Sequence, residues 1–485
     1  MATKTQKTTM NHAPSDIDNR ADEIHVSDKS LLRRIDWRIL PVMFLTYFLQ
    51  FLDKVVLNYA NVMNLQADLD MSGNDFSWLG TGFFMAYAVA EIPQGYLLQK
   101  YPITKVLGCN VLFWGVILCS SAAAQKYRDL LALRVLLGMT EAVVAPSLTL
   151  YTRMWYTPAE STPRFGFWYC GLGVGQILGG VISFGAQHAP ASQGLAGWRI
   201  MFLVVGVVNI LVALLVLFCL PISPETANFL SRKDKDRIHQ RLESDSGALG
   251  KKKFEPGLIL TTLADAHTWL LLLLTILVTL PSGLIMMFSS SLIRGFGYTS
   301  KESALLNTPS GIVSILSTMI STYAVSKGYP RWLAINVMLV PTLIGASLMS
   351  FLPEGQQAGS LAGIYLVNAT VAPLILIYAW TGSNFKGYTG KITGCALISA
   401  GFSIANIIGP QTFQARNAPD YLPAKITIVV ATAAAIVVAT ALRILYGRRN
   451  AKADKVGCAA KGYLEEKFME NREEQGGQDG FRYVY

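Results

Sequence analysis

Charged side chains are scarce in this sequence: Asp, Glu, Lys and Arg together make up 15% of its 485 residues. A soluble globular domain usually has about 25%. Six cysteines show neither a disulfide framework nor zinc-ligand spacing, and no GxxxxGK[ST] phosphate-binding loop occurs. We therefore expect no metal site and no cofactor. The five histidines are scattered over predicted tails and loops and form no catalytic cluster: His12, His25, His188, His239 and His267.

Apolar residues dominate instead, at 52% of the chain. A membrane-spanning helix needs about 20 mostly apolar residues, because its backbone polar groups must be satisfied within the hydrocarbon. Six such stretches precede the hydrophilic segment 221–266 and six follow it. They lie near 38–58, 76–98, 104–124, 130–151, 165–187, 198–220, 268–290, 303–324, 332–351, 359–381, 393–413 and 424–445. The composition predicts an all-α integral membrane protein that contacts lipid.

The net charge of +10 would suit a nucleic-acid partner, but its distribution argues against one. Basic residues gather in alternate loops, as in Arg33 and Arg34 before the first stretch, Lys251–Lys253 in the central loop, and Arg448 and Arg449 after the last. Cytoplasmic loops of membrane proteins carry this excess. We expect both termini and the central loop in the cytoplasm, with no cleaved signal peptide, because residues 1–28 lack an apolar core.

Three short segments of the first half recur in the second half, each displaced by nearly the same number of positions. The sequence EAVVAP at Glu141–Pro146 returns 227 positions later as NATVAP at Asn368–Pro373. Lys100-Tyr-Pro has its counterpart in Lys327-Gly-Tyr-Pro, and the glycine-rich run 171–179 returns at 401–409. Parallel repeats are one way in which transporters build a site at the interface of two halves. The copies differ at the position held by Glu141 and Asn368.

Five charged residues fall inside the predicted spans of the first half: Asp53, Lys54, Glu91, Arg134 and Glu141. A charge at a helix centre costs at least about 2.5–3.5 kcal/mol, so each one needs a reason. Seven residues turn a helix through about two turns, which places Arg134 and Glu141 on one face. Two buried acids beside two cations favour proton uptake and release. The alternatives are that Arg134 snorkels to the membrane boundary and that Glu141 packs as a neutral acid.

Neutral polar residues also occupy predicted spans. Tyr87 shares a helix face with Glu91, which either makes packing hydrogen bonds or joins a cavity. Gln176 and Asn406 hold equivalent positions in the third repeated segment, and Asn368 matches Glu141. Such amides commonly bond across helices, but their pseudo-symmetric placement also suits contact with a central ligand.

Several of these segments resemble a known family. The runs FLDKVVLNYA at 51–60 and RVLLGMTEAVVAP at 134–146, together with Trp155-Tyr156, Gly197-Trp198-Arg199 and Gly297-Tyr298-Thr299, are similar to the major facilitator superfamily. Within it, they resemble the anion:cation symporter family, and most closely its fungal allantoate permease branch. The similarity extends from about Arg33 to Arg443.

The resemblance implies twelve helices in two pseudo-symmetric six-helix bundles around a central cavity that opens alternately to each side. By this resemblance, Asp53 and Glu141 would handle protons, Lys54 and Arg134 would sense the substrate carboxylate, and Tyr87, Gln176 and Asn406 would contact the substrate. From their own positions in the chain, we add Glu91 as a candidate for proton coupling and Asn368 as a candidate for substrate binding. This chain has Lys54 where the wider family commonly has Arg. The lysine ammonium is a point charge, whereas the arginine guanidinium is a fork that can bind a carboxylate through two hydrogen bonds. Gating would involve Gly95, Lys100, Lys105, Lys327 and Arg331. The loop between the second and third spans keeps the first three of these but lacks the superfamily's usual acid and paired basic residues.

The expected function is proton-coupled import of a small organic anion, such as allantoate, ureidosuccinate, nicotinate or pantothenate, across the plasma membrane by a monomer. Export of an acidic metabolite made by the host cell would use the same fold. Two further alternatives are a multispanning membrane enzyme, which would need a polar catalytic cluster, and a nutrient sensor without transport, which would normally have a longer tail. The expected division is a disordered tail 1–28, a first bundle 29–223, a linker 224–266, a second bundle 267–446 and a disordered tail 447–485.

Overall fold

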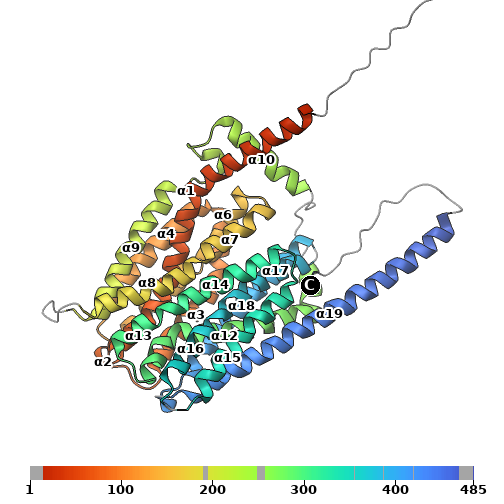
Figure 1. Cartoon of the computed structure of the whole chain (residues 1–485). Helices are drawn as coiled ribbons and strands as arrows, with labels where there is room; N and C mark the ends of the chain where they lie inside the picture. Colours follow the sequence, from red (N-terminus) through yellow and green to blue (C-terminus); the bar gives the residue numbers. More distant parts are fainter. Residues whose placement is uncertain are drawn as a thin grey trace, which may run out of the picture.

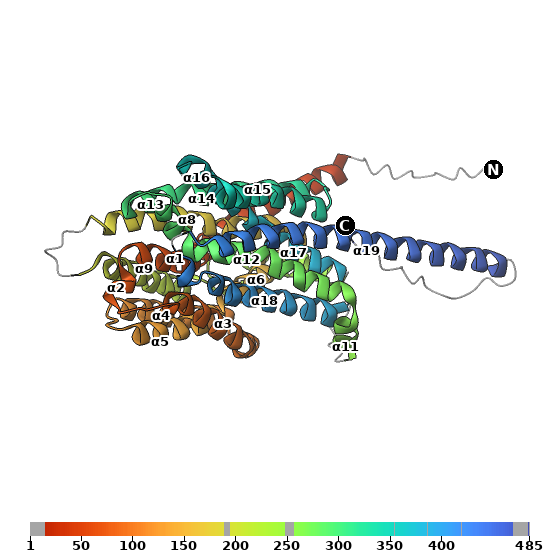
Figure 2. The same ribbon diagram turned by 90° about the horizontal axis from the view of Figure 1, so that it is seen from below.

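The computed structural model describes residues 15–188, 195–247, 257–353, 355–385, 387–418, 420–468 and 484, and these form helices joined by turns. Two bundles of helices lie side by side (Figures 1 and 2). The first consists of α1 (Ser15–Val62), α2 (Leu65–Asp68), α3 (Asp75–Lys100), α4 (Ile103–Ser121), α5 (Tyr127–Glu141), α6 (Val144–Trp155), α7 (Pro158–Tyr169), α8 (Gly171–Ala186) and α9 (Gly197–Cys219). This confirms the predicted all-helical, multi-span membrane fold.

The second bundle follows a linker that holds η2 (Pro224–Thr226), α10 (Arg232–Gly247) and α11 (Gly257–Ala264). It consists of α12 (Ala266–Gly295), α13 (Ser300–Leu306), α14 (Thr308–Ser326), α15 (Arg331–Phe351), α16 (Gln357–Val367), η3 (Asn368–Thr370), α17 (Val371–Asn384), α18 (Gly387–Thr412), η4 (Ala415–Asn417) and α19 (Leu422–Phe468). We call the end of the bundles where α1 begins the inner end, and the end where α1 finishes at Val62 the outer end.

Eleven helical segments of the described residues are long and apolar enough to cross a membrane. The twelfth expected span, near 76–98, corresponds to α3, which has 26 residues but a more polar sequence with Glu91 in its second half. Large apolar side chains such as Val89, Phe113 and Leu211 are exposed on the bundles. Such exposure suits contact with lipid tails.

Two helices are interrupted at the repeated segments EAVVAP and NATVAP. α5 ends at Glu141 and α6 begins at Val144, while α16 ends at Val367 and a 3₁₀ turn precedes α17. Each segment ends in a proline, Pro146 or Pro373, which lacks an N–H and crowds the carbonyl four residues earlier. The Gln50 amide donates to the Glu141 carbonyl oxygen at 3.3 Å, across from α1. The repeat detected in the sequence is therefore a pair of helix breaks, and one of them holds Glu141.

Both chain ends are more helical than the sequence suggested. α1 begins at Ser15, within the segment 1–28 that we expected to be disordered, and α19 continues to Phe468, well into the segment 447–485. Residues 451–468 contain four Ala and four Lys, which are good helix formers. Residues 1–14, 469–483 and 485 lie outside the described residues.

Polar contacts between the bundles gather at the outer end. The Asn58 amide donates to Ser289 at 2.7 Å and accepts from the Ser290 N–H at 3.1 Å, while Asn61 donates to Ser291 at 2.8 Å. The ring of Phe76 on α3 packs edge-on against Phe288 on α12, with 5.4 Å between their centroids. Any ligand that approaches the bundle interface from the outer end must therefore separate these contacts.

Candidate functional site

Four of the charged residues predicted within spans meet near the bundle interface. Asp53 and Lys54 lie on α1, and Arg134 and Glu141 lie on α5, two turns apart. Asp53 and Glu141 are fully buried, and Arg134 is 2% exposed. The side chain of Lys54 is 11% exposed. Buried charges of this kind persist only where partners compensate them.

The ion pairs join α1 to α5. Lys54 donates to Glu141, and its Nζ also donates to the Gln50 carbonyl oxygen at 3.0 Å. Arg134 Nη1 lies 3.7 Å from Asp53 Oδ1, which is an ion pair but too long for a hydrogen bond. Each residue of the Asp53-Lys54 dipeptide is thus paired with one charged residue of α5. These pairs connect the helix break at Glu141 to the first helix.

The pairing leaves hydrogen-bonding capacity unused. Both carboxylate oxygens of Asp53, one oxygen of Glu141, and Nε and Nη2 of Arg134 are buried without a hydrogen-bond partner among the described residues. Buried polar atoms are normally paired. The free acceptors can take a proton, and the free guanidinium donors match the two oxygens of a carboxylate.

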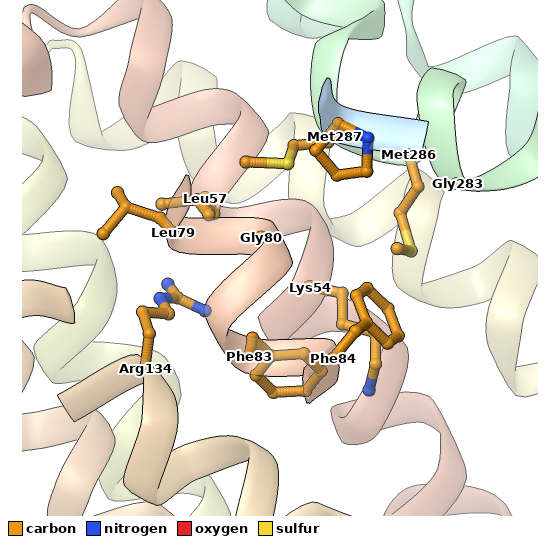
Figure 3. Close-up of a pocket in the computed structure, with 11 residues that line it drawn as sticks. Lys54, Leu57, Leu79, Gly80, Phe83, Phe84, Arg134, Gly283, Met286 and Met287 are labelled. Atoms are coloured by element: carbon orange, nitrogen blue, oxygen red, sulfur yellow. The ribbon is translucent and has the colours of Figure 1, made fainter. Parts of the chain in front are cut away.

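A small cavity lies next to these charges (Figure 3). Lys54 and Arg134 form its charged side, and Phe83 and Phe84 come from α3. The Lys54 ammonium also lies 5.2 Å from the centroid of the Phe83 ring. The volume of the cavity, about 20 Å³, is enough for one water molecule. A metabolite can therefore enter only when the bundles move apart.

The second bundle contributes an apolar wall to the cavity. Gly283, Met286 and Met287 come from α12, and Pro410 from α18. Figure 3 shows the methionines approaching from the side opposite the residues of α3 and α5. None of these four side chains can make a strong hydrogen bond. The cavity thus combines cations from the first bundle with an apolar surface from the second.

Glu91 and Tyr87 lie on α3, outside the lining of this cavity. Glu91 accepts a hydrogen bond from Ser399 of α18 and so links the two bundles. Tyr87 is 5% exposed, and its ring centroid lies 6.3 Å from that of Phe84, which does line the cavity. Tyr87 therefore lies behind Phe84 and does not itself line the cavity, and Glu91 lies at a separate contact between the bundles.

Two of the three predicted amides, Asn368 and Asn406, are engaged by nearby backbone. Asn368 and Asn406 each donate to the carbonyl oxygen four residues earlier in their own helices, at 2.8 Å in both cases. Asn406 also faces Gly283, where a Cβ would meet its amide oxygen. The backbone carbonyl oxygen of Gln176, and not its side-chain amide, accepts from the Tyr59 hydroxyl at 3.3 Å, near the contact between α8 and α14. Asn406 therefore lies against Gly283, a residue of the cavity lining.

The predicted gating residues lie away from the cavity. Gly95 is within α3, and open space surrounds the position that a Cβ would take there. Lys100 ends α3 and lies 5.7 Å from the Tyr101 ring, and Lys327 lies 5.4 Å from the Tyr323 ring. The exposed Lys105 is in α4, and Arg331 begins α15. They occupy the inner end, at corresponding positions of the two bundles.

Sequence reasoning missed several residues of the site. Gln50 supports the broken helix at Glu141, and Phe83 and Phe84 enclose the cations. Met286 and Met287, which the sequence pattern did not single out, also line the cavity. A hint was available in Pro281, which lies inside α12 just before them, because a proline within a helix favours a kink. Within the described residues, no three metal-ligating side chains come together.

Comparison with known proteins gives a consistent picture. The family model described as Major Facilitator Superfamily matches residues 43–410. An uncharacterised transporter of Schizosaccharomyces pombe is 36% identical over 90% of this chain and 85% of its own length. A thiamine pathway transporter of Saccharomyces cerevisiae is 35% identical, over 95% and 87% of the two chains. The allantoate permease of the same yeast is 33% identical, over 92% and 84%.

Solved structures agree on the fold. The proton:xylose symporter XylE bound to 6-bromo-6-deoxy-D-glucose superimposes with a TM-score of 0.68, over 83% of this chain and 94% of the other, at 14% identity. An inward-facing bacterial homologue of the lysosomal transporter Spinster gives 0.62, over 84% and 96%, at 18% identity. At these identities, the similarity concerns the arrangement of helices.

Proposed function

The chain belongs to the major facilitator superfamily, and we propose that it is a proton-coupled symporter that imports a small organic anion. It is a secondary transporter and not an enzyme. The observation that carries the proposal is the buried cluster of two cations and two acids beside a cavity. The allantoate permease, a relative named for an organic anion, adds support.

Charge balance explains why a proton and an anion would travel together. The cluster contains Asp53, Lys54, Arg134 and Glu141, whose formal charges cancel. An incoming carboxylate that binds Arg134 and Lys54 leaves the buried group with one excess negative charge, which is costly in a low dielectric. Protonation of Glu141 or Asp53 removes that excess. Each ligand thereby favours the binding of the other, which is thermodynamic coupling between two sites.

Alternating access supplies the transport step. The bundles are held together at the outer end by the contacts of Asn58 and Asn61 and by the edge-on contact of Phe76 with Phe288. Fewer polar contacts join them at the inner end of the described residues, where Glu91 meets Ser399. A rocking motion that exchanges these two sets of contacts would expose the cations first to one side and then to the other. We place the inner end in the cytoplasm and the monomer in the plasma membrane.

Uptake measurements test the proposal directly. Cells that lack their own permeases and express this chain are expected to accumulate a labelled small carboxylate faster at about pH 5 than at about pH 7. The panel should include nicotinate, pantothenate, ureidosuccinate and allantoate. Cells carrying an empty vector are the control. If no carboxylate accumulates at either pH, or if the rate of accumulation is the same at both, the proposal fails.

The apolar wall predicts a preference within that panel. Because the second bundle offers Met286, Met287 and Pro410 to the cavity, a carboxylate with an aromatic or aliphatic body loses less hydration on binding than a ureido acid. Replacing Met286 by glutamine is expected to lower the ratio of nicotinate to allantoate uptake by about tenfold. Met286→Leu, which keeps an apolar side chain of similar volume, should leave the ratio unchanged. An unchanged ratio in Met286→Gln would show that this wall does not select substrates.

A further inference from the structure

The penultimate residue of the chain is bound at the inner end of the second bundle. The Val484 N–H donates to Asn384 Oδ1 at 2.7 Å. Its carbonyl oxygen accepts from Asn384 Nδ2 at 3.1 Å and from Trp380 Nε1 at 2.8 Å. Asn384 is the last residue of α17, and Trp380 lies one turn earlier, so both side chains project from one face of the helix.

The site is built from buried groups. Trp380 is fully buried and Asn384 is 1% exposed. The Trp380 ring packs edge-on against Tyr446 of α19, with 5.6 Å between centroids. Asp265, just before α12, pairs with Arg449 of α19 at 2.6 Å and so fixes α19 against α12 nearby. Packing therefore fixes the indole N–H and the amide before any peptide binds, which lowers the entropy cost of binding.

The hydrogen bonds of Trp380 and Asn384 recognise the peptide backbone and not a particular side chain. In an extended chain, the N–H and C=O of one residue point to the same side, as they do toward a neighbouring strand. The Asn384 amide offers a matching acceptor and donor and takes the place of that neighbouring strand. Val484 is 44% exposed, so its side chain contributes little to recognition. Peptide capture by main-chain hydrogen bonds is a recurrent mode of recognition.

We propose that Trp380 and Asn384 form a binding site for extended peptide main chain, and that its ligand is the main chain of this same protein at Val484. Trp380 Nε1 and both polar atoms of the Asn384 amide are engaged by one residue, Val484. Without the peptide these buried groups would need other partners. Docking holds Val484 against α17 at the inner end of the second bundle.

Hydrogen–deuterium exchange of the full-length purified protein tests this site. The amide at position 484 is expected to exchange at least about tenfold more slowly than in a free synthetic peptide of the last ten residues, because opening must break its hydrogen bond to Asn384. Asn384→Ala should abolish the protection. Ser383→Ala is the matched control, since the Ser383 hydroxyl only bonds the Ala379 carbonyl oxygen of its own helix.

A tail variant keeps the test independent of how α17 folds. Val484→Ala alters only an exposed side chain and should retain the slow exchange at position 484, whereas recognition of the valine side chain would lose it. The proposal is overturned if the wild-type amide exchanges at the rate of the free peptide, or if Asn384→Ala leaves its protection intact. Protection that appears only at high protein concentration would assign the bound tail to a second copy and would overturn docking within one chain.

Discussion

Arg134→Gln is expected to abolish uptake at every pH. The variant removes the guanidinium that pairs with Asp53 and that carries two unpartnered buried donors, Nε and Nη2. A substrate carboxylate then loses a paired set of charge-assisted hydrogen bonds, and Asp53 is left as an uncompensated buried charge, which destabilises a protein by about 3–5 kcal/mol. Labelled-carboxylate uptake and the amount of protein at the membrane should be measured together.

Arg134→Lys separates recognition from folding. It keeps the positive charge beside Asp53 but loses the planar fork. Because hydrogen bonds to charged groups contribute about 1.5–3 kcal/mol each, apparent substrate affinity should fall by about 10- to 100-fold while the protein is still made. Arg128→Gln, at an exposed position of the same helix, is the control and should transport normally. Normal affinity in Arg134→Lys would exclude a carboxylate-binding role for Arg134.

Glu141→Gln is expected to abolish the acid stimulation of uptake. Glutamine copies the shape of the protonated acid but cannot release a proton, so the ratio of uptake at about pH 5 to that at about pH 7 should fall to about one. In the empty variant, the cations of Lys54 and Arg134 face only Asp53. The loaded form has no such imbalance, because the substrate anion replaces the lost charge.

Measurements of substrate exchange across the membrane distinguish a loss of proton coupling from a loss of folding or substrate binding. Only the empty variant carries the uncompensated cation, so net uptake should fall while exchange of labelled for unlabelled substrate across the membrane continues. Glu225→Gln, on an exposed linker residue, is the control and should keep both activities and the pH dependence. A wild-type pH profile in Glu141→Gln would remove Glu141 from proton coupling. Loss of both net uptake and exchange would place its role in folding or binding instead.

The sequence revealed the frame of the molecule because local chemistry determines it. Apolar runs of span length predicted the helices, and the repeat of 227 positions predicted two related bundles. The same repeat contained the helix breaks, since Pro146 and Pro373 each end it. The cost of burying charge singled out Asp53, Lys54, Arg134 and Glu141, and the structure brings all four together.

The partners of these residues could not be predicted in the same way. Spacing along α5 placed Arg134 and Glu141 on one face, but whether Lys54 meets Glu141 depends on how α1 rotates and packs against α5. The apolar character of the second bundle at the cavity was also hidden. Asn368 and Asn406 looked available for a ligand, yet both amides bond their own helix backbone, and methionines line the cavity.

The cancelling charges of the central cluster have an electrical consequence. Asp53, Lys54, Arg134 and Glu141 sum to no net charge, and a monovalent anion accompanied by one proton adds none. The membrane potential does work only on net charge that moves, about 2.3 kcal/mol per charge for each 100 mV. Uptake of such an anion with one proton would therefore be electroneutral, driven by the concentration differences of proton and anion, and would proceed equally well in a depolarised cell.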